Sequence, residues 1–262
     1  MRLTKRLRSG LSILRWREFA VAVGVCPFCG RSVLVRLCRD PRGLRCLRCA
    51  AGLAHLSLGK VMRQRKPDLG SLDVCELSAQ GPLADHLRRH ARSAAVSEYF
   101  PEAARGELHD GVRCEDVLRL TYPDATFDLV THTEVLEHVA DDARALSELH
   151  RVLKPGGLML FTVPLHGGEA TIERARIRGG TIEHLLPPVY HRDPLRREGI
   201  LAFRDYGSDI IGRLQAAGFE RAWIVPSEAS GLPWGFGYAV VCAERRSCDE
   251  HGAPSSSSAW KN

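Results

Sequence analysis

The stretch that decides the fold lies between Ser97 and Pro164. It reads SEYF at 97–100, VRCEDVLRLTYPDATFDLVTHTEVLEHV at 112–139 and RVLKPGGLMLFTVP at 151–164. Short apolar runs alternate with acidic turns, and a charged helical segment and a glycine break precede the last apolar run. This alternation predicts a parallel sheet covered by helices. An acid at the end of one strand and another after the next is the arrangement of a nucleoside site on such a sheet.

The same periodicities continue on both sides of this stretch. A helix over 141–152 places Leu146, Leu149 and Val152 on one apolar face, and we expect Lys154-Pro155-Gly156-Gly157 to end it. We expect the other helices at 82–90 and 209–217, and strands at 72–77, 94–97, 112–114, 127–131, 158–163, 221–225 and 238–243.

These motifs resemble class I S-adenosylmethionine-dependent methyltransferases of the small-molecule type, from about Leu69 to Arg246. The resemblance implies a Rossmann-like sheet of seven strands with helices on both faces, in a domain at 67–246. It also implies S-adenosylmethionine as the cofactor. Residues 165–206 are too long for a plain connection, and we interpret them as an insertion that acts as a substrate lid.

The family's first motif, an acid and a glycine-rich turn after strand one, corresponds to Glu76-Leu77-Ser78-Ala79-Gln80-Gly81-Pro82. Only Gly81 remains of the usual three glycines. Small Ser78 still permits close approach of the methionine end of the cofactor. Glu76, Ser78 and Gly81 are therefore predicted to bind the cofactor.

Two acids match the family positions that hold the nucleoside. Glu98 matches the acid that accepts hydrogen bonds from both ribose hydroxyls, a geometry that suits a carboxylate. Asp116 matches the acid on the adenine amino group, with Val117 beside the ring. His132 and Thr133 are expected in the loop after strand four, which in the family lies beside the reactive methyl group.

Candidates for catalysis are Tyr190 and His191 in the insertion, and His138 after strand four. Tyr190 and His191 are predicted to contact the acceptor or act as a general base, because an imidazole titrates near neutral pH. The alternative is a lid held by ordinary polar contacts. For Glu137 and His138, fixing the loop through hydrogen bonds is the alternative to catalysis.

Four of the nine cysteines form two CxxC pairs, Cys26-Pro-Phe-Cys29 and Cys46-Leu-Arg-Cys49, separated by sixteen residues. Two such pairs predict a structural Zn²⁺ on Cys26, Cys29, Cys46 and Cys49, in a small zinc ribbon at 26–66. The alternatives are unliganded cysteines, or Cys38 as a substitute ligand.

The charge of the chain is asymmetric. Residues 1–66 hold 16 Lys and Arg residues against two acids, a balance of +14, while the rest balances at −8 within a net charge of +6. We interpret 1–25 as a basic arm with a short helix around Ile13–Val23. It is suited to nucleic acid, an anionic membrane surface or an acidic partner, or serves only solubility. The tail at 247–262 is predicted to be disordered.

The leading hypothesis is a cytoplasmic S-adenosylmethionine-dependent methyltransferase. The apolar runs of the chain are far too short for a transmembrane segment. In this hypothesis the acceptor is a small molecule or glycan that is methylated on oxygen or nitrogen. One alternative is an RNA methyltransferase that uses the ribbon and basic arm to bind RNA. Another is a non-catalytic, zinc-dependent interaction protein.

Overall fold

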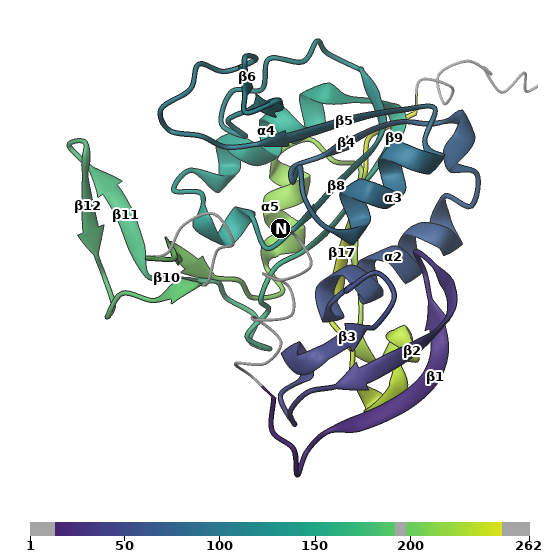
Figure 1. Cartoon of the computed structure of the whole chain (residues 1–262). Helices are drawn as coiled ribbons and strands as arrows, with labels where there is room; N and C mark the ends of the chain where they lie inside the picture. The colour runs from purple at the N-terminus through teal and green to yellow at the C-terminus, as the bar shows by residue number, and fades with distance from the viewer. Residues whose placement is uncertain (1–13, 192–197, 248–262) are drawn as a thin grey trace, which may run out of the picture.

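The computed structural model describes residues 14–191 and 198–247. Its centre is one eight-stranded sheet, ordered β16-β17-β9-β8-β4-β5-β7-β6 (Figure 1). Adjacent strands from β9 to β7 run parallel, whereas β17 is antiparallel to both β9 and β16. The bounds are β4 Asp73–Glu76, β5 Ser93–Glu98, β6 Leu108–His109, β7 Val112–Cys114, β8 Phe127–Thr133, β9 Leu153–Thr162, β16 Arg221–Val225 and β17 Val240–Glu244.

Seven of these strands were predicted from the sequence, and the mixed, mostly parallel sheet confirms the predicted fold class. The eighth, β6, is a two-residue edge strand paired with β7. Two boundaries differ from expectation. Helix α4 (Asp142–Val152) ends at Val152 as expected, but β9 begins at Leu153 rather than at Leu158, so Lys154-Pro155-Gly156-Gly157 lies in the strand. Strand β8 extends through His132 and Thr133, which were expected in the following loop.

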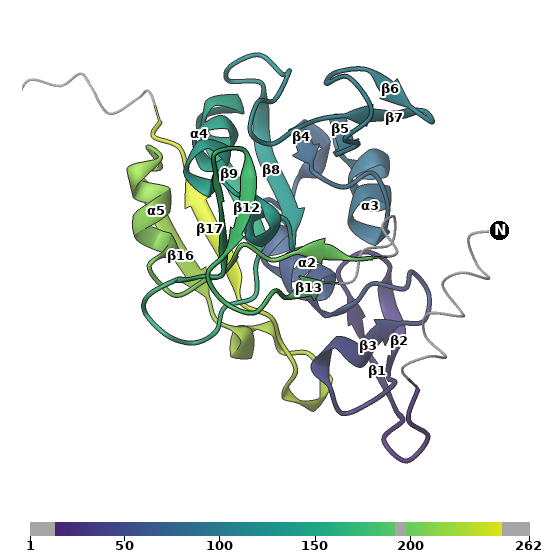
Figure 2. The same ribbon diagram turned by 90° about the vertical axis from the view of Figure 1, so that its left-hand side faces the viewer.

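Helices cover both faces of the sheet (Figure 2). Neighbouring strand residues alternate between two cores: Val74 and Leu129 join the core on the side of α2 (Leu53–Arg65) and α3 (Pro82–His90). Val130 lies in the opposite core, with α4 and α5 (Ile210–Ala216). Strands buried on both faces explain why their sequences are nearly continuous apolar runs.

The N-terminal cysteine pairs lie in a three-stranded antiparallel sheet of β1 (Ala20–Cys26), β2 (Gly30–Arg36) and β3 (Leu44–Cys46). The predicted helix around Ile13–Val23 is wrong. Residues 14–19 form no helix, and from Ala20 onward alternating small and branched residues pair along β1 with β2. Phe28 and Leu34 belong to the same buried core as Val74 of the main sheet. This small sheet is therefore packed onto the large one through α2.

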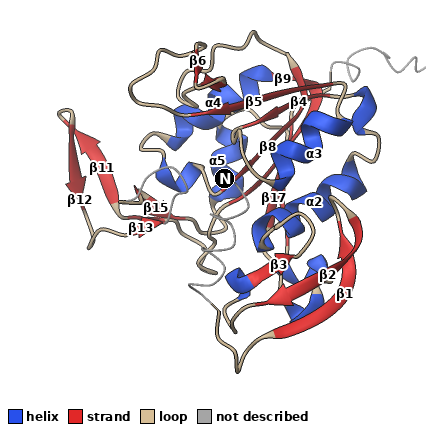
Figure 3. Ribbon diagram, in the orientation of Figure 1, coloured by secondary structure: helices blue, strands red, loops and turns tan. Residues whose placement is uncertain are grey.

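The insertion is built from short antiparallel strand pairs (Figure 3). These are β10 (Ile172–Glu173) with β15 (Arg204–Asp205), β11 (Ala175–Arg178) with β12 (Thr181–His184), and β13 (Tyr190–His191) with β14 (Ile200–Leu201). The β11–β12 hairpin extends away from the main sheet (Figure 1). Whether the insertion acts as a lid stays a prediction.

The first thirteen residues of the basic arm, and all but the first residue of the predicted disordered tail, lie outside the described residues. No helix within 14–191 or 198–247 combines the length and the apolar character that crossing a membrane requires.

Candidate functional site

Acidic side chains meet at the carboxyl edge of the main sheet. Glu76 is the last residue of β4, Glu98 is the last residue of β5, and Asp116 lies two residues beyond β7. These strands are neighbours and run parallel, with Glu76 opposite Val96 and Glu98 opposite Cys114. The structure thus brings the three predicted acids to one edge, where open parallel sheets bind their ligands.

Glu76 differs from the other two acids because it is buried, with 2% of its surface exposed. The hydroxyl of Thr131 on β8 donates a hydrogen bond to its carboxylate. Burial, opposed by this hydrogen bond, raises the pKa of Glu76 to about 8, and the charge of Glu98 adds to the shift. The side chain is therefore largely protonated at neutral pH and is able to donate a hydrogen bond.

The turn after β4 leads into α3. Gly81 has a φ of +103°, a conformation that side chains disfavour, and it stands directly before Pro82 at the start of the helix. The Ser78 hydroxyl donates a hydrogen bond to the carbonyl of Gln80 at 3.2 Å. No side chain caps this end of α3, so its first amides remain available to a ligand.

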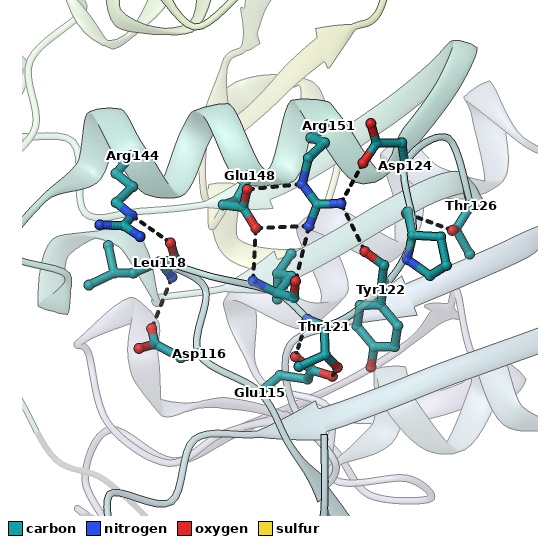
Figure 4. Close-up of polar contacts among 12 residues, drawn as sticks. Glu115, Asp116, Leu118, Thr121, Tyr122, Asp124, Thr126, Arg144, Glu148 and Arg151 are labelled. Carbon is teal, nitrogen blue, oxygen red and sulfur yellow. Dashed lines mark hydrogen bonds and ion pairs between the residues drawn. The ribbon is translucent and has the colours of Figure 1, made fainter. Parts of the chain in front are cut away.

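The loop that carries Asp116 and Val117 is fixed from α4 (Figure 4). Arg144 Nε donates to the carbonyl of Leu118 at 2.8 Å, and Leu118 N donates to Asp116 Oδ1 at 2.9 Å. Arg151 Nη2 donates to the carbonyl of Leu120 at 3.0 Å. These bonds orient the Asp116 carboxylate without help from a ligand, and both Asp116 and Val117 stay half-buried at the edge of the sheet.

His132, near the end of β8, is fully buried and stacks on Phe161, with ring centroids 4.6 Å apart. Burial lowers the pKa of His132 to about 3. Neither ring nitrogen has a hydrogen-bond partner within the described ranges. The next residue, Thr133, is half-buried. In this conformation, then, Thr133 is the more accessible of the two predicted cofactor residues of β8.

A second group of side chains gathers just beyond β8. The 3-10 turn η3 (Leu136–His138) holds Glu137 and His138, and β13 brings His191 to them. The two imidazole rings meet edge to face, with centroids 4.9 Å apart. The Glu137 carboxylate, whose Oε1 lies 3.7 Å from His191 Nδ1, raises the pKa of His191 above its ordinary value. Two of the three predicted catalytic residues therefore come together, whereas Tyr190 is 56% exposed.

The structure adds residues to this site that were not predicted there. Glu134 has a φ of +55°, uncommon for a residue with a side chain. Burial, and then the charge of Glu137, raises its pKa to about 7. Tyr238 lies beside Glu134 and also has a raised pKa, chiefly from burial. The sequence offers no signal for Tyr238, because it follows an irregular segment far along the chain.

The four paired cysteines form one cluster. Sγ of Cys26 lies 3.6 Å from Sγ of Cys49, and Sγ of Cys29 lies 3.5 Å from Sγ of Cys46. All four sulfurs lie within 4.8 Å of one another. Four sulfurs at about 2.3 Å from a tetrahedral Zn²⁺ stand about 3.8 Å apart, so the spacing fits this ion. Cys38 is not in the cluster, and its thiol faces the carbonyl of Asp40.

Comparisons with known proteins agree with this geometry. Residues 75–161 match the family described as a methyltransferase domain. The chain is 31% identical over 175 residues to a demethylmenaquinone methyltransferase from Thermus thermophilus. This alignment covers 66% of each of the two chains. It is 35% identical over 90 residues to a ubiquinone biosynthesis O-methyltransferase from Coxiella burnetii, covering 31% of this chain and 38% of that one.

A 27-O-demethylrifamycin SV methyltransferase from Amycolatopsis mediterranei is 33% identical over 105 residues, 37% of this chain and 39% of that one. A solved S-adenosylmethionine-dependent methyltransferase from Mesorhizobium loti aligns with a TM-score of 0.46 at 18% identity, over 72% of this chain and 98% of that one.

The order of the sheet, the matched methyltransferase domain and the Thermus relative lead to one class. The chain belongs to the class I S-adenosylmethionine-dependent methyltransferases, whose methyl donor is S-adenosylmethionine. It spans 66% or less of the length of the curated relatives described above.

Proposed function

We propose that this protein transfers a methyl group from S-adenosylmethionine to an oxygen or nitrogen of a small-molecule acceptor. The observation that carries the proposal is the pair Glu98 and Asp116, which lie at or just beyond the ends of the adjacent parallel strands β5 and β7. Both are half-buried at the carboxyl edge and therefore within reach of a ligand. The family match over 75–161 contains both.

In this proposal each part of the donor has its own residues. Glu98 accepts hydrogen bonds from the ribose hydroxyls, and Asp116 accepts one from the adenine amino group while Val117 lies against the ring. Glu76, Ser78 and Gly81 face the methionine end, where the φ of +103° at Gly81 lets the backbone come close.

When bound, S-adenosylmethionine supplies an electrophilic methyl carbon on a sulfonium. The protein aligns the acceptor with that carbon and excludes water. His132 and Thr133 end β8 on this side of the sheet, and Glu137, His138 and His191 follow. The relatives named for quinone and rifamycin substrates support a small acceptor. The RNA alternative has no comparable support among them.

We further propose a structural Zn²⁺ on Cys26, Cys29, Cys46 and Cys49. The sulfur spacing supports it, since all four sulfurs lie within 4.8 Å of one another. Neighbouring thiolates repel one another, so four crowded thiols do not all lose their protons without a cation. A bound Zn²⁺ compensates the negative charge and stabilises the thiolate form.

The test is calorimetric titration with S-adenosylhomocysteine, the demethylated product of the donor. The wild-type chain should bind it, and Glu98→Ala should bind it about 1–3 kcal/mol more weakly, because a charged hydrogen-bond acceptor is lost. Glu102→Ala is the matched control, since Glu102 is exposed and pairs with His109 at 3.5 Å, away from the acids at the sheet edge. Absence of binding by the wild type would favour the non-catalytic alternative. Equal affinity of Glu98→Ala and Glu102→Ala would refute the role of Glu98.

A further inference from the structure

The starting point is a buried carboxylate that lacks donors. The side chain of Glu137 is 1% exposed, and within residues 14–191 and 198–247 neither of its oxygens accepts a hydrogen bond. The ring nitrogens of two histidines lie close to Oε1: His138 Nε2 at 3.8 Å and His191 Nδ1 at 3.7 Å. Burying a carboxylate is costly unless a cation or several donors compensate it.

The second observation concerns the proton of His138. Its Nδ1 lies 2.8 Å from the carbonyl oxygen of Leu201. A carbonyl only accepts hydrogen bonds, so Nδ1 carries the proton and donates it. In the neutral ring Nε2 then bears a lone pair, and this lone pair faces Oε1 of Glu137. Two acceptors facing each other across 3.8 Å are the arrangement that a cation between them would stabilise.

We infer that Glu137, His138 and His191 bind a divalent transition-metal ion. One ligand atom from each residue lies within 4.8 Å of the others. Metal–ligand bonds of about 2.0–2.2 Å require these atoms to close in by no more than small side-chain movements. Two imidazoles and one carboxylate form a ligand set typical of Zn²⁺ and of Fe²⁺, with Mn²⁺ and Co²⁺ as substitutes.

The surroundings hold the three ligands in place. Phe203 N donates to the carbonyl of Glu137 at 2.7 Å, and β13 pairs with β14 so that His191 stands opposite Ile200. The next residue of β14, Leu201, supplies the carbonyl that orients His138. A carbonyl behind a ligating histidine is the usual support of a metal-binding imidazole. The insertion therefore delivers one ligand and orients another.

The site is closed on one side and accessible on the other. The Glu137 side chain is 1% exposed, whereas that of His191 is 31% exposed. Three protein ligands leave coordination positions free, as in catalytic rather than structural metal sites. If the proposed methyl transfer is correct, on which this step rests, a free position would bind an acceptor hydroxyl and lower its pKa. The acceptor would then be an oxygen nucleophile.

The experiment uses full-length protein whose cysteine site is already filled with Zn²⁺, without methyl donor. We titrate it with Co²⁺ and follow both heat and visible absorption. The wild type should bind one further equivalent, with the spectrum of nitrogen and oxygen ligands and no cobalt–thiolate bands. Glu137→Gln, which keeps the shape of the side chain, and His191→Asn should each weaken binding at least 10-fold.

His184→Asn is the matched control, because His184 is an exposed histidine of the same insertion. It should bind Co²⁺ as the wild type does. Circular dichroism and S-adenosylhomocysteine affinity, measured on each variant, separate a failure of this site from misfolding or from failure of the donor site. Absence of Co²⁺ binding by folded wild type would mean that Glu137 pairs with a protonated imidazole and would overturn the proposal. Unchanged affinity in Glu137→Gln would also overturn it.

Discussion

Replacing Arg204 by methionine tests how the insertion is attached to the methyltransferase domain. Arg204 is 3% exposed, on β15. Its guanidinium donates to the carbonyl oxygens of Val139 at 2.5 Å and Ala140 at 2.8 Å, and to the Glu173 carboxylate at 3.1 Å. One buried cation thus joins the segment after β8 to two strands of the insertion.

The magnitude follows from what the substitution leaves behind. Methionine retains much of the apolar volume but donates no hydrogen bond, so the carbonyl oxygens of Val139 and Ala140 lose this donor. The Glu173 carboxylate keeps its pairing with Arg213 at 3.0 Å. Each unsatisfied buried acceptor costs about 1–3 kcal/mol. The buried Asp142 carboxylate also loses the Arg204 guanidinium 3.7 Å away, although it keeps Arg213 at 2.9 Å. Because the costs overlap at one residue, we expect a loss of about 3–5 kcal/mol in the free energy of unfolding.

The assay is urea denaturation followed by circular dichroism, with Arg176→Met as the matched control. Arg176 also pairs with a glutamate across a hairpin of the insertion, but it is 54% exposed, so its loss should cost less than about 1 kcal/mol. Arg204→Met should also weaken Co²⁺ binding, because the segment that holds Glu137 and His138 loses its anchor. Equal stability of the two variants would show that water satisfies these carbonyls and would refute the reasoning.

Three further predictions concern the cysteine cluster and the donor turn. Purified wild type should contain about one equivalent of zinc by elemental analysis, Cys46→Ala should lose it together with thermal stability, and Cys38→Ala should keep it. The pKa of Glu76 is about 8 in the folded state against an ordinary value of 4.5, so between these pH values the folded state holds a proton that the unfolded state releases. The free energy of unfolding should therefore fall as pH rises through this range. If denaturant titrations of Glu76→Gln showed an equally steep fall in the free energy of unfolding, this would contradict the assignment. Gly81→Ala should destabilise the protein by about 1–3 kcal/mol and weaken S-adenosylhomocysteine binding, because the φ of +103° at this position strains a residue with a side chain. Gly212→Ala is the control: it lies in open space within α5, so the change should be neutral or stabilise the protein by up to about 1 kcal/mol.

Much of the methyltransferase sheet was predictable because its signals are local. The bounds of α3 and β16 agree with expectation to the residue. A proline at the first helical position and a glycine before it mark the start of α3. The acids Glu98 and Asp116 were predictable for a similar reason, since the ends of parallel strands meet at one edge of the sheet.

Helix α2 was not predicted from the sequence, for two reasons. It lies within the segment interpreted as a zinc ribbon, and it contains Gly59, which disfavours a helix interior. The structure explains this glycine, because a Cβ atom there would lie 2.5 Å from the ring of Phe28. Here tertiary packing requires what local propensity opposes.

The contact between Glu137 and His191 could not be predicted from sequence. It depends on β13 and β14, each only two residues long. Strands this short have no periodicity to detect, and their pairing is set by hydrogen bonds to the segment after β8. Tyr190 and His191 were proposed together from their place in the insertion and the chemistry of their side chains. Only the alternation of side chains along a strand separates the exposed tyrosine from the histidine that reaches Glu137.

The cysteine cluster and the donor turn are connected through α2. Phe28 lies between the first two cysteines and packs against Gly59 of α2. One turn earlier on that helix, His55 places its Nε2 within 3.7 Å of where a Cβ on Gly81 would stand. The cysteine-bearing sheet, α2 and the main sheet also share one buried core. A metal that fixes the position of Phe28 would thereby fix the helix beside the donor turn. Residues 20–65, which carry the cysteine cluster and α2, therefore form one wall of the methyltransferase fold.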